Sequence, residues 1–254
     1  MSTGQRIVLF DLFGVIALHQ RPGALAEMAA SCHAPADAFT EAYWALRPAY
    51  DAARQSAPQY WTAVLRRLSR PVDTGTIEKL RLADIDSWSR VDDHMVAYVQ
   101  SLRSRAQVAV LSNIPADHAR AFRAAQPWLE NLDYVAFSGM INVAKPEPSA
   151  FRRCVTAMHA APADFLFVDD REENVRAAQA VGMTGHVFTG LGKLVKAVNI
   201  WLPASTASPR LPQRRTGPRP SCPQGNPCST RSDAHIADRG SHSRAVVTGG
   251  YASG

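Results

Sequence analysis

The sequence is poor in cysteine and contains no cysteine pair at metal-binding spacing. Its four cysteines, Cys32, Cys154, Cys222 and Cys228, form no CxxC motif, so we expect reduced thiols instead of a zinc site or a disulfide framework. No run of about eighteen apolar residues exists, which argues against a membrane-spanning helix. No segment has the form of a secretory signal peptide. These absences predict a cytoplasmic protein with no membrane partner.

Most of the chain also lacks an excess of positive or negative charge. The formal net charge is +6, but residues 203–254 hold seven arginines and two aspartates and account for +5 of it. Residues 1–202 are therefore nearly neutral. Because a nucleic-acid partner generally requires a basic surface on the folded domain, the composition gives only weak evidence for one.

Residues 203–254 differ in composition from the rest of the chain. They include 21 Pro, Gly or Ser residues and few large apolar ones. Such a segment buries too little apolar surface to offset the entropy lost on ordering, so we expect a disordered tail. The alternative is an arginine-rich tail that binds nucleic acid or a partner protein.

Short apolar runs alternate with helical patterns along the remaining chain. Strands are predicted at 7–10, 107–111, 134–137, 165–168 and 186–188. Helices are predicted between and after them, at 92–105, 116–125, 149–159, 173–181 and 191–201. This alternation predicts an α/β fold with a Rossmann-like parallel sheet and right-handed crossovers. The hydrophobic content of 46% is sufficient for a sizeable core.

Residues 20–90, the helical insertion, interrupt this alternation after the first strand. Apolar residues recur at helical spacing over 24–31, 35–46, 59–68 and 74–87. We therefore expect an α/β core of residues 1–19 and 91–202 with a separate helical domain inserted between them. The insertion is rich in aromatic residues that would pack its core, although one or two could face a substrate. They are Tyr43, Trp44, Tyr50, Tyr60, Trp61 and Trp88.

Polar side chains stand at the ends of the predicted strands. Carboxyl ends of parallel strands share one edge of a sheet, where open α/β folds bind their ligands. Two separated acidic ends suit a hard cation such as Mg²⁺, and a hydroxyl, a backbone amide and an ammonium suit phosphate oxygens. The residues concerned are Asp11, Ser112, Asn113, Asp169 and Asp170, with Lys145 in the loop after the third strand.

Four segments in this order resemble the four motifs of the haloacid dehalogenase superfamily, whose members are mostly Mg²⁺-dependent phosphatases. The segments are FDLFGVI at 10–16, LSN at 111–113, KPEP at 145–148 and FVDDREENV at 167–175. The resemblance covers roughly residues 5–200. The helical insertion resembles the cap domain of that family.

The resemblance implies a role for each residue of the set. Asp11 would be the nucleophile and form an aspartyl-phosphate, while Ser112, Asn113 and Lys145 would hold the phosphoryl group, Lys145 also stabilising Asp11. Mg²⁺ would be held by Asp11, the backbone carbonyl of Phe13 and Asp170, with Asp169 and Asn174 supporting the site from behind. The implied substrate is a small phosphorylated metabolite, whose identity the sequence does not give; the oligomeric state is also open.

Phe13 departs from the phosphatase pattern. The resemblance places a second aspartate there, which protonates the leaving group and then activates water, and phenylalanine can do neither. General acid–base catalysis is worth about 10²–10⁴ in rate, so its loss would slow the reaction, least for good leaving groups. An aromatic residue here also resembles the metal-independent dehalogenases of the family, although those lack the acidic pair at 169 and 170. The alternatives are therefore a 2-haloacid dehalogenase or a binding protein of weakened activity. His19 could substitute as proton carrier or be a solvated loop histidine.

Overall fold

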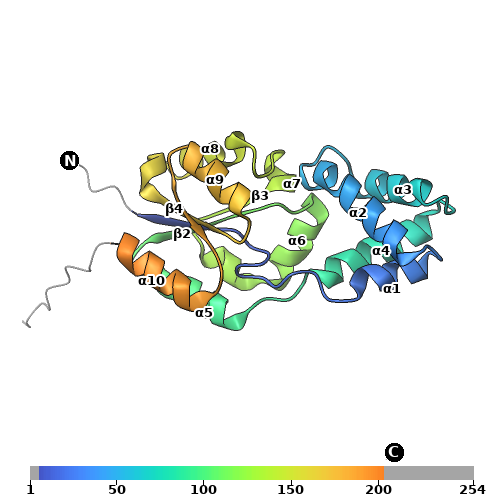
Figure 1. Ribbon diagram of the computed structural model, residues 1–254, viewed down its shortest axis with the longest axis horizontal. Coiled ribbons are helices and arrows are strands. Elements are labelled where there is room, and N and C mark those ends of the chain that lie inside the picture. The colour runs from blue at the N-terminus through green and yellow to red at the C-terminus, as the bar shows by residue number, and fades with distance from the viewer. Residues whose placement is uncertain (1–5, 203–254) are drawn as a thin grey trace, which may run out of the picture. The chain divides into compact units, whose positions relative to one another are not determined.

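The apolar runs of the sequence form a five-stranded parallel sheet in the computed structural model, which describes residues 6–202. The strand order is β3-β2-β1-β4-β5, so β1 lies at the centre between β2 and β4 (Figure 1). The register pairs Phe10 of β1 with Val110 and with Val168, which brings the carboxyl ends of three strands level. The strands are β1 (Ile7–Phe10), β2 (Gln107–Ser112), β3 (Tyr134–Phe137), β4 (Phe165–Asp169) and β5 (Thr184–Val187).

Helices cover both faces of the sheet. Alternate residues of a strand point to opposite faces, so Val8 and Phe10 pack with α5 (Asp93–Leu102), α6 (Ala116–Ala125) and α10 (Leu191–Trp201). Ile7 and Leu9 pack on the opposite side with α8 (Pro148–Ala157) and α9 (Glu172–Ala180) (Figure 1). β1 is fully buried on both faces, as its continuous apolar run predicts. Three short elements complete this part: η1 (Pro127–Asn131), α7 (Ser138–Ile141) and η2 (Pro162–Asp164).

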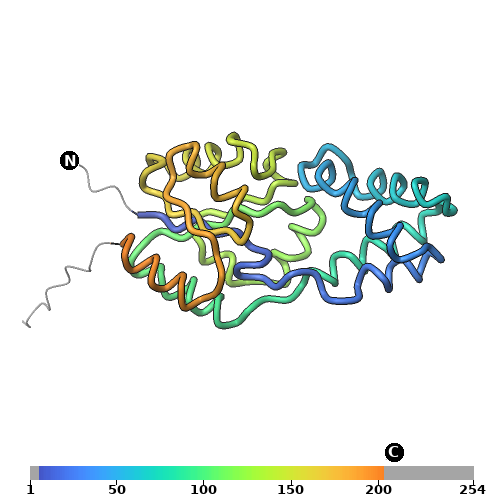
Figure 2. Tube along the Cα trace, viewed as in Figure 1, coloured from blue at the N-terminus to red at the C-terminus, as the bar shows by residue number. Residues whose placement is uncertain are grey.

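The helical insertion consists of α1 (Ala24–Ser31), α2 (Ala36–Asp51), α3 (Ala57–Arg67) and α4 (Thr74–Ser87). Its four helices enclose a hydrophobic cluster of their own, centred on the buried rings of Tyr43, Tyr60 and Trp61. The two connections to the sheet run side by side (Figure 2), joined by hydrogen bonds from Leu18 N to Arg90 O and from Asp92 N to Ile16 O.

The predicted α/β class and parallel sheet are confirmed, while several bounds differ. α2 continues to Asp51, five residues beyond the predicted end, although Pro48 lies within it. The reason is that Arg47 and Tyr50 are buried, so tertiary packing outweighs the local cost of proline. β5 is the partly exposed edge strand and begins at Thr184, two residues early, and α7 forms in a predicted loop. The division into two separate domains stays a prediction.

Three further sequence predictions concern the cysteines, membrane-spanning helices and the C-terminal tail. Cys32 and Cys154 are buried free thiols, as expected. Within residues 6–202, every helix is too short or too polar to span a bilayer. The predicted disordered tail, residues 203–254, lies outside the described part of the chain.

Candidate active site

A buried ion triad lies at the carboxyl edge of the sheet. Asp11 follows β1, Asp169 ends β4, and Lys145 stands in the loop before α8. Lys145 Nζ lies 2.7 Å from Oδ1 of Asp11 and 2.6 Å from Oδ2 of Asp169. Because all three side chains are buried, the ammonium compensates two carboxylates that would otherwise be costly to bury.

Within the triad, the pKa values of Asp11 and Lys145 differ from their usual values. Burial raises the pKa of Asp11 to about 7, even though the Lys145 ammonium acts in the opposite direction. Burial would lower the pKa of Lys145, but the neighbouring carboxylates Asp11 and Asp169 outweigh it and raise that pKa. Lys145 is therefore a fixed positive charge beside the candidate nucleophile.

Asp169 has its carboxylate oxygens occupied by protein donors. Besides Lys145, the backbone N–H of Arg171 donates to Oδ1 over 2.8 Å, and Asn174 Nδ2 lies 3.1 and 3.0 Å from the two oxygens. Arg171 and Asn174 lie at the start of α9, so the helix terminus fixes this carboxylate. Asp169 thus contacts Lys145, and its predicted supporting role stays a prediction.

Asp170 adds a third carboxylate to the same edge. One carboxylate oxygen each from Asp11, Asp169 and Asp170 lie within 4.8 Å of one another. Since Asp169 is engaged, Asp11 and Asp170 are the available oxygen donors, an arrangement that fits a hard divalent cation. Burial and the nearby Asp169 raise the pKa of Asp170, which a bound cation would counteract. The predicted contact from the carbonyl of Phe13 stays a prediction.

Gly14 makes room for this acidic cluster. Its φ of +87° is a left-handed conformation, and a Cβ atom there would stand 2.4 Å from Oδ2 of Asp170. The loop then brings His19 Nε2 to 3.5 Å from the same oxygen, with the His19 side chain 70% exposed. Only glycine allows the chain to turn this close to Asp170.

Ser112 and Asn113 differ in what their side chains do. The Ser112 hydroxyl is buried, and its oxygen has no hydrogen-bond partner among residues 6–202 although it lines the hollow above Asp11. A buried polar group of this kind is usually paired, so the Ser112 hydroxyl is available to hydrogen-bond a ligand oxygen. The Asn113 side chain instead exchanges two 2.8 Å hydrogen bonds with the backbone of Lys145. Asn113 therefore positions the lysine loop, and any phosphate contact would have to use its backbone amide.

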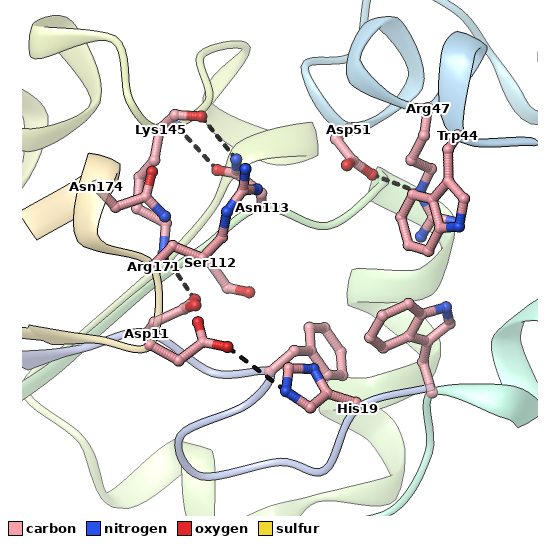
Figure 3. A pocket seen from close by; sticks show the side chains of 13 residues that line it. Asp11, His19, Trp44, Arg47, Asp51, Ser112, Asn113, Lys145, Arg171 and Asn174 are labelled. Atoms are coloured by element: carbon pink, nitrogen blue, oxygen red, sulfur yellow. Dashed lines mark hydrogen bonds and ion pairs between the residues drawn. The ribbon is translucent and has the colours of Figure 1, made fainter. Parts of the chain in front are cut away.

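The hollow has a volume of about 230 Å³ and two chemically different sides (Figure 3). The sheet edge supplies the predicted residues Asp11, Ser112, Asn113, Lys145, Asp170 and Asn174. The helical insertion supplies residues that were not identified as site residues from the sequence: Trp44, Arg47, Asp51 and Trp88. The aromatic content of the insertion pointed to Trp44 and Trp88 as two of six candidates; the other four pack inside the insertion. No signal in the sequence marked Arg47 or Asp51.

Phe13 forms part of the aromatic wall of this hollow. Its ring meets Trp88 edge-on with centroids 4.9 Å apart and Phe122 at 5.5 Å. Such pairs add about 0.5–1.5 kcal/mol beyond simple burial. Phe13 thus joins the strand-end loop to the helical insertion, but it has no proton to exchange with a substrate.

A buried polar network fixes the insertion side of the hollow. The carboxylate of Asp84 in α4 accepts hydrogen bonds from Tyr43 Oη at 2.7 Å and Arg47 Nη1 at 2.9 Å, and lies 2.9 Å from Nε2 of His118 in α6. Although burial alone would raise it, the pKa of Asp84 is lowered by Arg47 and His118. Burial alone would lower the pKa of His118, but Asp84 and Asp117 raise it. The network therefore ties Arg47 to both the insertion and the sheet-covering helix.

Comparisons with known proteins agree with this fold. The chain is 31% identical over 97 residues to the sesquiterpene phosphatase astK of Aspergillus oryzae, a match that spans 38% of this chain and 50% of that protein. A HAD-family enzyme of Bacteroides thetaiotaomicron, solved with magnesium and inorganic phosphate, superposes with a TM-score of 0.61 at 17% identity, covering 72% of this chain and 93% of the other. The L-2-haloacid dehalogenase of Xanthobacter autotrophicus gives 0.53 at 18%, covering 71% and 76%.

The match to a family model decides the assignment. The haloacid dehalogenase-like hydrolase model aligns with residues 5–182, a stretch that contains strands β1 to β4 and the helical insertion. The four motifs noted in the sequence all lie within it. The chain therefore belongs to the haloacid dehalogenase-like hydrolases.

Proposed function

We propose that this hydrolase is a Mg²⁺-dependent phosphatase that acts on a small phosphorylated metabolite through an aspartyl-phosphate on Asp11. The observation that carries the proposal is the buried, unpartnered hydroxyl of Ser112, which lines the same hollow as Asp11 and Lys145. A hydroxyl and an ammonium beside a carboxylate can bind the oxygens of a phosphate while the carboxylate faces phosphorus.

The reaction would proceed in two in-line steps. Deprotonated Asp11 attacks phosphorus, the bond to the leaving oxygen breaks, and water then hydrolyses the aspartyl-phosphate from the side that the leaving group has vacated. Ser112 and Lys145 hold the equatorial oxygens throughout. Mg²⁺, held by Asp11, Asp170 and the carbonyl of Phe13, would supply positive charge that offsets the charge of the phosphoryl group.

The walls of the hollow indicate the kind of alcohol that carries the phosphate. Phe13, Trp44 and Trp88 contribute aromatic surface to the hollow, and the Trp44 residue is 46% exposed. Aromatic walls favour an organic group with apolar surface. The partial similarity to a sesquiterpene phosphatase supports the same class of substrate. We propose a small apolar phosphate ester as substrate, with no nucleic-acid or membrane partner.

Phe13 also favours a second candidate, metal-independent dehalogenation of a 2-haloacid, and a third, a binding protein without turnover. The carboxylate pair at Asp169 and Asp170 argues against the second. One panel separates them: phosphate release from esters with and without Mg²⁺, and chloride release from 2-haloacids with and without EDTA. We expect phosphate release that requires Mg²⁺. EDTA-resistant chloride release would favour the dehalogenase, and thermal stabilisation by phosphate esters without any turnover would favour the binding protein.

A further inference from the structure

The proposed phosphatase needs a proton for the leaving oxygen, and Phe13 cannot provide it. In an in-line displacement the leaving oxygen departs on the side opposite the nucleophile. Asp11 attacks from the sheet edge, so the leaving oxygen emerges toward the helical insertion. Figure 3 shows Asp51 and Arg47 of α2 on that side of the hollow, across from Asp11.

We propose that Asp51 of the helical insertion is the general acid and base of this site. This inference rests on the proposed phosphoryl transfer. Protonated Asp51 gives its proton to the leaving oxygen as the P–O bond breaks, which releases the alcohol and leaves a carboxylate. That carboxylate then takes a proton from the water that attacks the aspartyl-phosphate, so that Asp11 and inorganic phosphate are released and Asp51 is protonated again.

Asp51 is held in a fixed position relative to the sheet edge. Its backbone carbonyl accepts a 2.6 Å hydrogen bond from Ser138 Oγ, in α7 at the end of β3. The same Ser138 oxygen accepts a 2.8 Å bond from the backbone N–H of Ile114, two residues after Ser112. One side chain therefore links the end of α2 to the segment that carries the candidate phosphate ligand. Catalytic groups require such positioning to be effective.

The Asp51 side chain is also free to exchange a proton. Arg47 Nε donates to Oδ1 over 2.8 Å, while Oδ2 forms no hydrogen bond within residues 6–202. Burial raises the pKa of Asp51 although Arg47 and His118 oppose it, and Asp84 acts in the same direction as burial. A raised pKa brings a carboxyl closer to the range in which it serves as both acid and base.

Two other groups on the hollow fit this role less well. Asp170 lies beside Asp11 on the sheet side and is a proposed metal ligand. His19 lies against Asp170, and its side chain is 70% exposed, whereas that of Asp51 is 17% exposed. Among the residues of 6–202 that line the hollow, Asp51 alone has a carboxyl that is largely shielded from water and lies on the leaving-group side.

The test compares Asp51→Asn with the natural protein on aryl and primary alkyl phosphates in the presence of Mg²⁺. Asparagine keeps the shape and can still accept the bond from Arg47, but it cannot donate an acidic proton. We expect kcat/KM to fall about 10²-fold on alkyl phosphates and by no more than a few-fold on p-nitrophenyl phosphate, which needs little protonation. The matched control is Asp37→Asn, an exposed aspartate of the same helix, which should behave as the natural protein.

A second readout reports the water step. With p-nitrophenyl phosphate, Asp51→Asn should release one equivalent of nitrophenol in a burst and then turn over slowly, because the base for water is missing. If Asp51→Asn lowers kcat/KM equally for both esters, or for neither, the role of Asp51 is overturned. The proposed phosphatase activity would still stand. No phosphate release by the natural protein from any ester would overturn both proposals. Should Asp51→Asn fail to fold, Asp51→Ser provides the same comparison.

Discussion

The ammonium of Lys145 lies 2.7 Å from the carboxylate of Asp11, at the buried centre of the site. This contact keeps a negative charge available where burial alone would favour a protonated acid. In the proposed mechanism the same ammonium has a second task, which is to bind a phosphate oxygen of the substrate.

Lys145→Met should therefore damage both catalysis and stability. Without the ammonium, Asp11 and Asp169 are buried beside each other with no counter-charge, which costs roughly 3–5 kcal/mol when one partner of a buried pair is removed. We expect phosphate release to fall at least about 10²-fold, since a preorganised charge at the transferring group is lost. Lys193→Met, at an exposed lysine of α10, is the control for both the melting temperature and the rate. A Lys145→Met protein as active as the natural one would remove the lysine from the mechanism.

Asp170→Ala tests the proposed metal ligand. Loss of a residue that only supports a metal ligand typically weakens metal binding by roughly 10–100-fold. Loss of the ligand itself should raise the Mg²⁺ concentration for half-maximal activity by at least as much. The measurement is a Mg²⁺ titration of phosphate release, with Glu172→Ala as the exposed neighbour for comparison. An unchanged titration curve would show that Asp170 is not a ligand.

The protonation of His118 should be visible in stability. Its pKa is raised in the folded protein, so its ion pair with Asp84 is fully stabilising below the unfolded value near 6.5 and is lost as the pH rises through the folded value. His118→Gln removes this charge. The difference in melting temperature between the two proteins should be largest below about pH 6.5 and shrink at higher pH. His94→Gln, at an exposed histidine of α5, is the control. A difference that does not vary with pH would contradict a charged His118.

The effect of Phe13→Asp on the rate should depend on whether Asp51 is present. If Asp51 already supplies the proton, a new carboxyl at position 13 brings little gain to the natural protein. In the Asp51→Asn protein, however, Phe13→Asp should restore alkyl phosphate hydrolysis by up to about 10²-fold. Phe13→Asn in the same background loses the ring contact with Trp88 equally but carries no proton, so it separates the chemistry from the packing. Equal rates for the two double variants would mean that position 13 lies out of reach of the leaving oxygen.

The sheet and its site edge could be read from the sequence because their signals are local. A continuous apolar run such as Ile7–Phe10 marks a strand buried on both faces, and the polar residue after it falls at the ligand-binding edge. Asp11 and Asp170 were predicted as site residues in this way, whereas Lys145 was predicted from the loop after the third strand. The structure places the Lys145 ammonium 2.7 Å from Asp11. The end of α2 could not be found in this way: the helical spacing ended at residue 46, whereas the packing of Tyr50 carries the helix through Pro48 to Asp51.

The residues that the helical insertion contributes to the site are not marked by any local pattern in the sequence. Whether a residue such as Arg47 or Asp51 faces solvent, helix or substrate depends on how α2 packs against α4 and the sheet-covering helices. The contacts that decide this, from Asp84 to Arg47 and from Ser138 to the backbone of Asp51, join residues far apart in the chain. The packing of Phe13 against Trp88 is of the same kind: the sequence showed which chemistry the ring lacks, but not which contact it makes.

The central claim is that Asp11 becomes phosphorylated during turnover, and acid-quenched mass spectrometry measures this directly. The natural protein is mixed with Mg²⁺ and an aryl phosphate, quenched within the first turnover and digested. We predict that the peptide containing Asp11 carries one added phosphoryl group, and that Asp11→Asn, with the same melting temperature, shows neither this mass nor phosphate release. Sustained phosphate release by the Asp11→Asn protein, or a phosphoryl group on another residue, would contradict the account.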